Sequence, residues 1–199
     1  MKEIDIKAAA RNLPPVPDAV LDRLAARAVR EGLVDISYGE MDSPVGNLLL
    51  AVTRDGLVRI SYTDHNEGAL EEISRRLSPR IMRRPQATDV VRRQLDEYFA
   101  RRRQEFDLAI DWALVRGFGR GVLRATVAIP YGRLSTYRDV AAAAGNAKAS
   151  RATGNALGAN PIPIVIPCHR VLRTGGGLGG YTGGLHRKQL LLEVEGVLL

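Results

Sequence analysis

The chain has 199 residues, 45% of them hydrophobic, which allows one domain or two small ones and excludes a disordered composition. One cysteine excludes an internal disulfide and a multi-cysteine zinc site, so we expect no structural metal and a reducing compartment. The sequence has no apolar stretch of about 18 residues and no signal-peptide core, so we expect a cytoplasmic protein without a membrane partner.

The formal net charge of +7 is unevenly placed. Residues 113–199 hold 11 Lys and Arg against 3 Asp and Glu, whereas residues 1–112 hold 18 against 19. This asymmetry indicates a polyanionic partner for the carboxyl-terminal half, with nucleic acid first among the candidates. The alternative is a basic surface that serves only solubility.

The amino-terminal residues predict an arm, a helix and an α/β domain. Residues 1–17 are expected to be irregular, and apolar residues at helical spacing predict a helix from Asp18 to about Glu31. Alternating apolar residues predict three strands of an antiparallel sheet, at 34–38, 47–52 and 57–62, the last two joined as a hairpin. Two helices and a last strand are expected at 69–77, 91–99 and 106–112.

These patterns indicate an arm and helix in residues 1–33, an α/β domain in 34–112 and a third region in 113–199. Ten arginines lie between Arg75 and Arg103. We expect most of them on solvated helix faces, with a weak secondary DNA contact as the alternative.

The third region is predicted to be mostly helical. A helix at 118–128 is followed by a turn at Pro130-Tyr131-Gly132. Thr136 is placed to cap a helix at 137–144, with Asp139 reaching back to the cap, and a second short helix follows at 149–158. Two short helices joined by a tight link predict a helix-turn-helix.

The second of these helices, ASRATGNALG, has one long polar side chain, Arg151. Its small residues would let it come close to a narrow groove of a duplex; they are Ala149, Ser150, Ala152, Gly154 and Gly158. A glycine- and alanine-rich packing helix is the alternative.

Residues 160–172, NPIPIVIPCHRVL, contain the single cysteine. Three prolines and an apolar run predict a stiff, buried, extended segment that ends on Cys168, His169 and Arg170. A thiol becomes a nucleophile as thiolate, and His169 and Arg170 could supply a base or a cation. Neighbours in an extended chain point apart, so we expect a water between Cys168 and His169. The alternative is a buried cysteine without chemistry and a surface histidine.

A glycine-rich stretch at 174–184 predicts a loop that forms one wall of a pocket, with a flexible linker as the alternative. A last helix is expected at 186–194, with Leu190, Leu191 and Val194 on its buried side.

PCHRV preceded by NPIPIVI resembles the active-site signature of the O6-alkylguanine-DNA alkyltransferases, and the similarity extends from about Ile129 to Glu195. The resemblance implies an α+β fold, in which a ribonuclease-H-like antiparallel sheet with helices precedes a helical domain containing the helix-turn-helix. It implies irreversible transfer of an alkyl group from O6-alkylguanine, and from O4-alkylthymine, in double-stranded DNA to the protein's own cysteine. Each molecule would act once and without a cofactor.

The resemblance also implies roles for single residues. Cys168 is the nucleophile, His169 the water-mediated base and Glu195 the carboxylate that orients the imidazole. Tyr137 donates to the guanine, and Asn160 is the hinge before the cysteine segment.

For DNA, the resemblance implies that the second motif helix docks in the minor groove and that Arg151 fills the gap left by the flipped nucleotide. The pocket would be lined by Leu157, Pro163, Val171 and Thr182. A monomer in solution is implied, with cooperative assembly on DNA left as an alternative.

Two other classes of function compete with this interpretation. A cysteine hydrolase needs an oxyanion hole and an activated water, and no further motif indicates either. A non-catalytic sensor of alkylated DNA would share the helix-turn-helix and the pocket, but such sensors lack the cysteine, so Cys168 discriminates against that class.

Overall fold

The computed structural model describes residues 17–64 and 68–197. The chain divides into two compact units, residues up to Val34 and residues from Asp35 onward. The first unit contains α2 (Asp18–Arg30), which confirms the predicted helix. Val20, Leu21 and Leu24 on this helix are all close to half exposed or more. Except for Pro17, the predicted arm lies outside the described residues.

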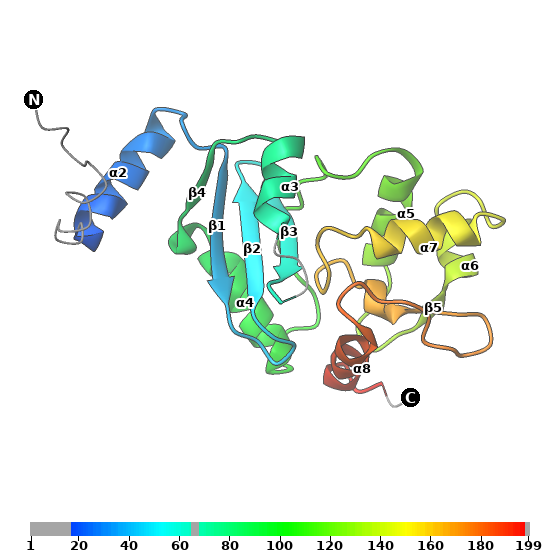
Figure 1. Cartoon of the computed structure of the whole chain (residues 1–199). Helices are drawn as coiled ribbons and strands as arrows, with labels where there is room; N and C mark the ends of the chain where they lie inside the picture. The colour runs from blue at the N-terminus through cyan, green and yellow to red at the C-terminus, as the bar shows by residue number, and fades with distance from the viewer. Residues whose placement is uncertain (1–16, 65–67, 198–199) are drawn as a thin grey trace, which may run out of the picture. The chain divides into compact units, whose positions relative to one another are not determined.

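The second unit begins with a four-stranded sheet in the order β3-β2-β1-β4 (Figure 1). Its strands are β1 (Ile36–Met41), β2 (Leu48–Thr53), β3 (Gly56–Tyr62) and β4 (Ile81–Arg83). The antiparallel pairing of β2 with β3 confirms the predicted hairpin. β4 pairs with β1 in parallel, so the sheet is mixed and not wholly antiparallel as predicted. Three residues are too short a strand to show an alternating pattern.

Two predicted helices of this part are confirmed, α3 (Ala69–Arg76) and α4 (Asp89–Phe99), the latter preceded by a 3-10 turn, η1 (Pro85–Thr88). The predicted strand at 106–112 is wrong. Within that segment only Ile110 forms a bridge, to Leu57. Its alternating apolar residues are half-buried against the core, and such a segment has the same period of two as a strand.

The rest of the second unit is mostly helical, as predicted. Its helices are α5 (Gly117–Val127), α6 (Tyr137–Ala143), α7 (Ser150–Gly158) and α8 (Leu185–Val194), with two short parallel strands, β5 (Ser135–Thr136) and β6 (Val171–Leu172). Thr136 Oγ1 accepts from the N–H of Asp139 at 3.2 Å and donates to its carboxylate at 2.7 Å, which confirms the predicted cap. Ala149 is the N-cap of α7 and not its first helical residue.

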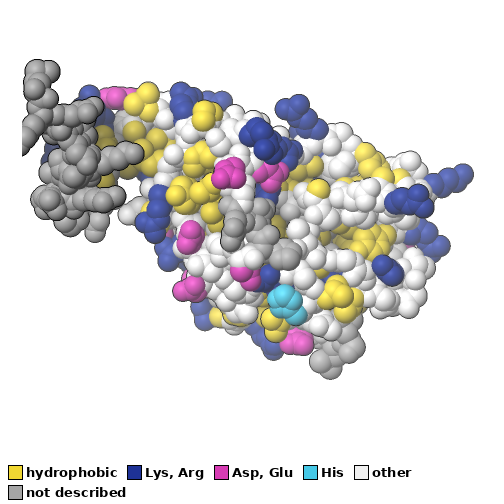
Figure 2. Space-filling model, viewed as in Figure 1, with side chains coloured by type: hydrophobic (Ala, Val, Ile, Leu, Met, Phe, Trp, Pro, Cys, Tyr) yellow, Lys and Arg dark blue, Asp and Glu magenta, His cyan; other side chains and the backbone are white. Residues whose placement is uncertain are grey.

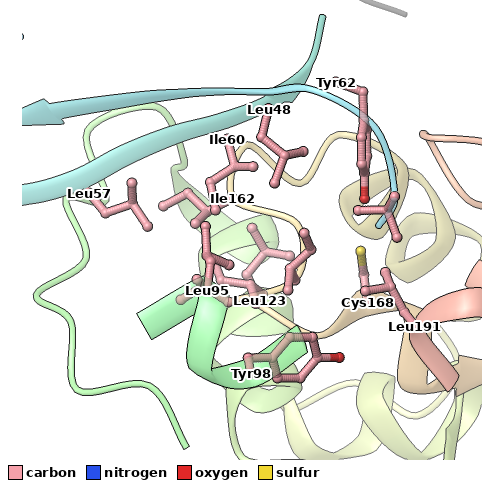
Figure 3. Packing of buried hydrophobic residues seen from close by; sticks show 14 of the residues in the cluster. Leu48, Leu57, Ile60, Tyr62, Leu95, Tyr98, Leu123, Ile162, Cys168 and Leu191 are labelled. Carbon is pink, nitrogen blue, oxygen red and sulfur yellow. The ribbon is translucent and has the colours of Figure 1, made fainter. Parts of the chain in front are cut away.

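The sheet and the helical part of this unit share one hydrophobic core (Figure 3). Leu48 and Ile60 from the sheet belong to the same cluster as Leu123 of α5, Ile162 and Cys168. Every residue from Asn160 to Leu172 is buried, as the sequence predicted. A boundary between 112 and 113 stays a prediction.

Helix α8 matches the predicted buried face in part: Leu191 is buried and Val194 is partly buried against the core, as predicted, whereas Leu190 is not buried. Leu190 is 39% exposed, while Leu191 and Leu192 are fully buried together with Arg187 and Lys188. The two basic residues are buried because they are hydrogen-bonded, Arg187 to Asp64 and Lys188 to backbone carbonyls. No helix in the described residues is long and apolar enough to cross a membrane.

Candidate active site

The cysteine lies in a tight turn. Residues Cys168–Arg170 form a 3-10 turn, η2, and not the extended segment that was predicted. Ile164 has a φ of 75°, a left-handed conformation that is strained for a β-branched residue. The chain therefore bends twice between Pro163 and Arg170. No hydrogen bond joins the Cys168 and His169 side chains in the described residues.

Asn160 holds the cysteine segment at both ends. Its Nδ2 donates to Cys168 Sγ at 3.2 Å and to Ile166 O at 2.9 Å, and its Oδ1 accepts from the N–H of Ile162 at 3.0 Å. The side chain is buried, so these contacts satisfy its polar atoms inside the core.

Burial raises the pKa of the Cys168 thiol, and the Asn160 hydrogen bond and the charge of Lys188 act in the opposite direction. Lys188 Nζ donates to Val171 O at 2.6 Å and to Leu178 O. Burial lowers the pKa of Lys188 to about 8. The resting site therefore holds a neutral thiol beside a partly desolvated ammonium.

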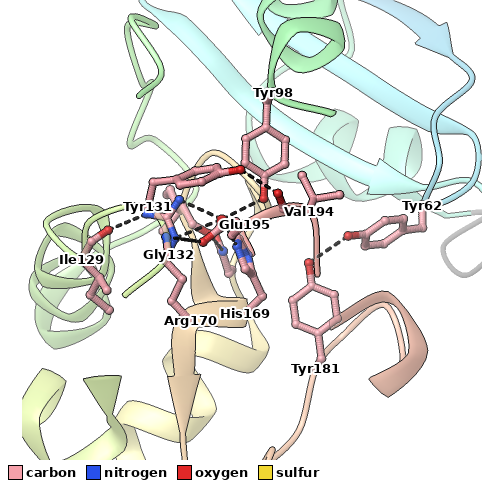
Figure 4. A network of polar contacts seen from close by, with 12 residues as sticks. Tyr62, Tyr98, Ile129, Tyr131, Gly132, His169, Arg170, Tyr181, Val194 and Glu195 are labelled. Atoms are coloured by element: carbon pink, nitrogen blue, oxygen red, sulfur yellow. Dashed lines mark hydrogen bonds and ion pairs between the residues drawn. The ribbon is translucent and has the colours of Figure 1, made fainter. Parts of the chain in front are cut away.

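Behind the turn, His169 and Glu195 form a buried pair (Figure 4). His169 Nε2 lies 2.7 Å from Glu195 Oε1, and both side chains have no exposed area. In the described part of the chain, His169 Nδ1 has no hydrogen-bond partner. If Nε2 carries the proton toward the carboxylate, Nδ1 is free to accept one.

Glu195 is surrounded by donors. Arg170 Nε donates to Oε2 and Arg170 Nη2 to Oε1, each at 2.9 Å, and the N–H of Gly132 donates to Oε2 at 3.1 Å. Tyr98 Oη donates to Oε1 at 2.8 Å. Burial alone would raise the pKa of Glu195, but the hydrogen bonds and charges of His169 and Arg170 outweigh it and lower the pKa to about 2. Burial lowers the pKa of His169, against the opposing effect of Glu195.

A cavity of about 650 Å³ opens at the sulfur. Eight of the predicted site residues line it: Tyr137, Ser150, Arg151, Gly154, Leu157, Gly158, Cys168 and Thr182. The wall formed by the glycine-rich loop is held in place, since Thr182 Oγ1 donates to Gly158 O at 2.6 Å. Arg138 and Arg173, which the sequence analysis did not single out, also line the cavity.

Other predicted residues do not line this cavity. Pro163 and Val171 are buried, Pro163 in a bridge to Ile166 and Val171 in β6 as part of the hydrophobic core. Ala152 is exposed on α7 and Ala149 is half-buried at its N-cap.

Two contacts to the site come from tyrosines that sequence reasoning gave no site role. Tyr98 lies in the helix predicted at 91–99, and its hydroxyl reaches Glu195. Tyr62 at the end of β3 shares a 2.8 Å hydrogen bond with Tyr181 of the glycine-rich loop. Both contacts join residues about a hundred positions apart, so no local pattern could show them.

Two family models match the chain. Residues 36–112 match the ribonuclease-like domain of 6-O-methylguanine DNA methyltransferase, and residues 117–197 match its DNA binding domain. The chain belongs to the O6-methylguanine DNA methyltransferase family. This confirms the family and the α+β fold that the sequence predicted, with the sheet corrected to a mixed one.

Similar members of this family come from bacteria and archaea. A methylated-DNA–protein-cysteine methyltransferase of Mycolicibacterium paratuberculosis is 41% identical over 167 residues, covering 80% of this chain and 92% of that protein. One from Methanosarcina acetivorans is 36% identical, covering 80% and 97%. The crystal structure of Mycobacterium tuberculosis OGT in complex with DNA is 37% identical, with a TM-score of 0.69 and coverage of 80% and 92%.

No group of three His, Cys, Asp or Glu that could hold a metal ion occurs among the residues the structure describes.

Replacing Asn160 with Ala should raise the pKa of the Cys168 thiol, because the thiolate loses the hydrogen bond that the Asn160 side chain donates to it. The measurement is the rate of iodoacetamide alkylation against pH, which should shift to higher pH. Asn155→Ala, an exposed position on α7, is the control and should leave the profile unchanged. An unshifted profile in a folded Asn160→Ala protein would contradict the assignment.

Proposed function

We propose that this protein repairs DNA by transferring the alkyl group of O6-alkylguanine to Sγ of Cys168. The observation that carries the proposal is that the only sulfhydryl of the chain lines the 650 Å³ cavity beside a buried imidazole–carboxylate pair. Membership of the O6-methylguanine DNA methyltransferase family supports the same reaction.

In the proposed reaction, the S–C bond forms as the bond between the alkyl carbon and O6 breaks, and that electron pair stays on the purine. A water carries the thiol proton to His169 Nδ1, which is unpartnered in the described residues. Glu195 stabilises the imidazolium through Nε2. The purine takes a proton from the Tyr137 phenol, and the resulting phenolate is reprotonated through solvent by the proton held on His169. The net change is therefore transfer of the thiol proton to guanine. The thioether product is stable to water, so each molecule acts once.

The substrate base must leave the helix to reach the sulfur, because the cavity floor is buried. We assign Tyr137 as the donor because it lines the cavity next to the loop wall, where its hydroxyl lies close to Gly179. Arg151 is exposed at the rim and carries a side chain long enough to enter a duplex. Asn160 acts as the hinge that holds Cys168 below them.

The proposed partner is double-stranded DNA, bound through α7 by a monomer. Basic side chains gather over α6 and α7 on the face drawn in Figure 2. Gly158 has room for a β-carbon, since an ideal Cβ there meets nothing within 4 Å. A helical glycine that packing does not require is explained by close approach of a ligand backbone.

Reaction with a duplex that contains O6-methylguanine should add one methyl group per chain, on the peptide that contains Cys168. Intact-mass and peptide mass spectrometry make this measurement. Cys168→Ala should lose the transfer and keep duplex binding, because α6 and α7 are unchanged. Several turnovers without modification of the protein would contradict the proposal.

Arg151→Ala should slow repair of a duplex more than reaction with free O6-benzylguanine, because only the duplex has a base to unstack. The loss on duplex should not exceed the unstacking free energy, on the order of a few kcal/mol. Single-turnover rates on both substrates test this. The control is Arg75→Ala, an exposed arginine on α3, which removes the same charge. Equal losses of rate on duplex and on the free base would mean that Arg151 maintains the structure of the site and does not act in base extrusion.

Gly158→Ala should stabilise the protein by about 0.5–1 kcal/mol while weakening duplex binding. The gain follows from the open space around its β-position, and the loss from a methyl group on the surface that meets DNA. Urea unfolding and a duplex titration measure the two effects. Gly121→Ala in α5 is the matched control, expected to gain stability without losing affinity. Unchanged binding in Gly158→Ala would remove α7 from the proposed interface.

A further inference from the structure

The Glu195 carboxylate receives a hydrogen bond from a part of the chain that the proposed chemistry does not use. Tyr98 lies in α4, 97 residues before Glu195, and its hydroxyl donates to Oε1 at 2.8 Å. The same oxygen lies 2.7 Å from His169 Nε2 (Figure 4). Tyr98 and His169 therefore share one acceptor atom.

The hydroxyl is fixed in position by the packing of its ring. Tyr98 is fully buried, and three aromatic rings surround it, those of Phe99, Phe106 and Tyr131, with centroids 5.4, 5.4 and 6.0 Å away. Burial and the neighbouring Glu195 raise the pKa of Tyr98 well above its ordinary value. The phenol is therefore a permanent neutral donor that cannot turn away.

A hydrogen bond donated to Oε1 changes the pKa of His169 in a predictable direction. Each hydrogen bond to an ionised carboxylate stabilises its charge and reduces its attraction for another proton donor. The other charged and titratable groups facing Tyr98 and the pair are Arg170 on η2, Lys188 on α8 and Tyr131. Of these, Arg170 contacts the carboxylate directly, and Tyr131 donates to Val194 O at 2.7 Å instead.

We propose that Tyr98 is a positioning residue for the His169–Glu195 pair: it fixes Oε1 and limits how strongly the carboxylate holds the imidazole proton. The sheet-containing part of the chain would thereby take part in alkyl transfer and not only in folding. This inference rests on the proposed function, since it assigns His169 as the base.

The test is the pKa of the His169 imidazole, followed by NMR in the full-length protein, together with the rate of alkyl transfer against pH. Tyr98→Phe removes the donor and keeps the ring. Glu195 then attracts the imidazolium proton more strongly, so the pKa of His169 should rise by roughly half a unit or more. The acidic limb of the rate profile should move up by the same amount.

Tyr131→Phe is the matched control, because it removes a hydroxyl from the same aromatic cluster without touching the carboxylate. It should leave both the pKa of His169 and the acidic limb in place. 3-Fluorotyrosine at position 98 is a second variant that keeps the hydroxyl and makes it a stronger donor. It should lower the pKa of His169, a change opposite in sign to that of Tyr98→Phe.

Equal shifts in Tyr98→Phe and Tyr131→Phe, or a lower rate without any shift, would overturn the proposal and leave Tyr98 a packing residue. The imidazole titration needs no alkyl transfer. Suppose that the protein transfers no alkyl group, but the pKa of His169 rises in Tyr98→Phe and falls with 3-fluorotyrosine at position 98. That result would refute the proposed function and support the hydrogen-bond coupling.

Discussion

The structure around the cysteine depends on one buried negative charge, the carboxylate of Glu195. A carboxylate without exposed area is tolerated only when donors surround it, and removing one partner of a buried pair typically costs about 3–5 kcal/mol. Its four donors come from three separate parts of the chain: Tyr98 from α4, Gly132 from the turn after α5, and His169 and Arg170 from η2. The need to satisfy this charge therefore fixes α4, the turn after α5 and the cysteine turn against the end of α8. The same constraint that stabilises the fold sets the orientation of His169.

Burial gives the site two neutral partners at rest. It raises the pKa of the Cys168 thiol and lowers the pKa of His169, so proton transfer between them has to accompany the reaction. A standing thiolate would react with oxidants and free alkylating agents, whereas a buried thiol is inert until a base removes its proton. Asn160 and Lys188 oppose the effect of burial without reversing it, so they make the deprotonated state accessible. Reactivity then depends on a substrate that fits the cavity.

The sequence predicted the local elements and missed contacts that are distant in the chain. Thr136 and Asp139 predicted the start of α6, and the prolines around Cys168 predicted that no long helix forms there. Both predictions succeeded because capping and proline act within a few residues. The strand expected at 106–112 failed because half-buried residues alternate in any extended segment, and β4 was too short to show a pattern. Leu190 was placed on the wrong face of α8 because buried Arg187 and Lys188 looked like solvent-facing residues. Tyr98 lies among the apolar residues of its helix, and only the tertiary fold shows that its hydroxyl contacts Glu195.

The glycines near the cavity show how one residue type serves two different needs. In the loop, an ideal β-carbon on Gly183 would lie 2.5 Å from Tyr62 Cε2, and one on Gly179 would lie 2.5 Å from Tyr137 Oη. These positions need glycine because the loop packs directly on tyrosine rings, which forms the cavity wall before any ligand binds. On α7, Gly158 meets no such neighbour and Gly154 has only ordinary contacts with Tyr137. Packing explains Gly179 and Gly183 of the loop and leaves Gly154 and Gly158 of α7 unexplained. Glycine within a helix costs conformational entropy. Because no packing contact on α7 requires it, we infer that the absence of side chains there lets a molecule outside the fold approach the helix closely.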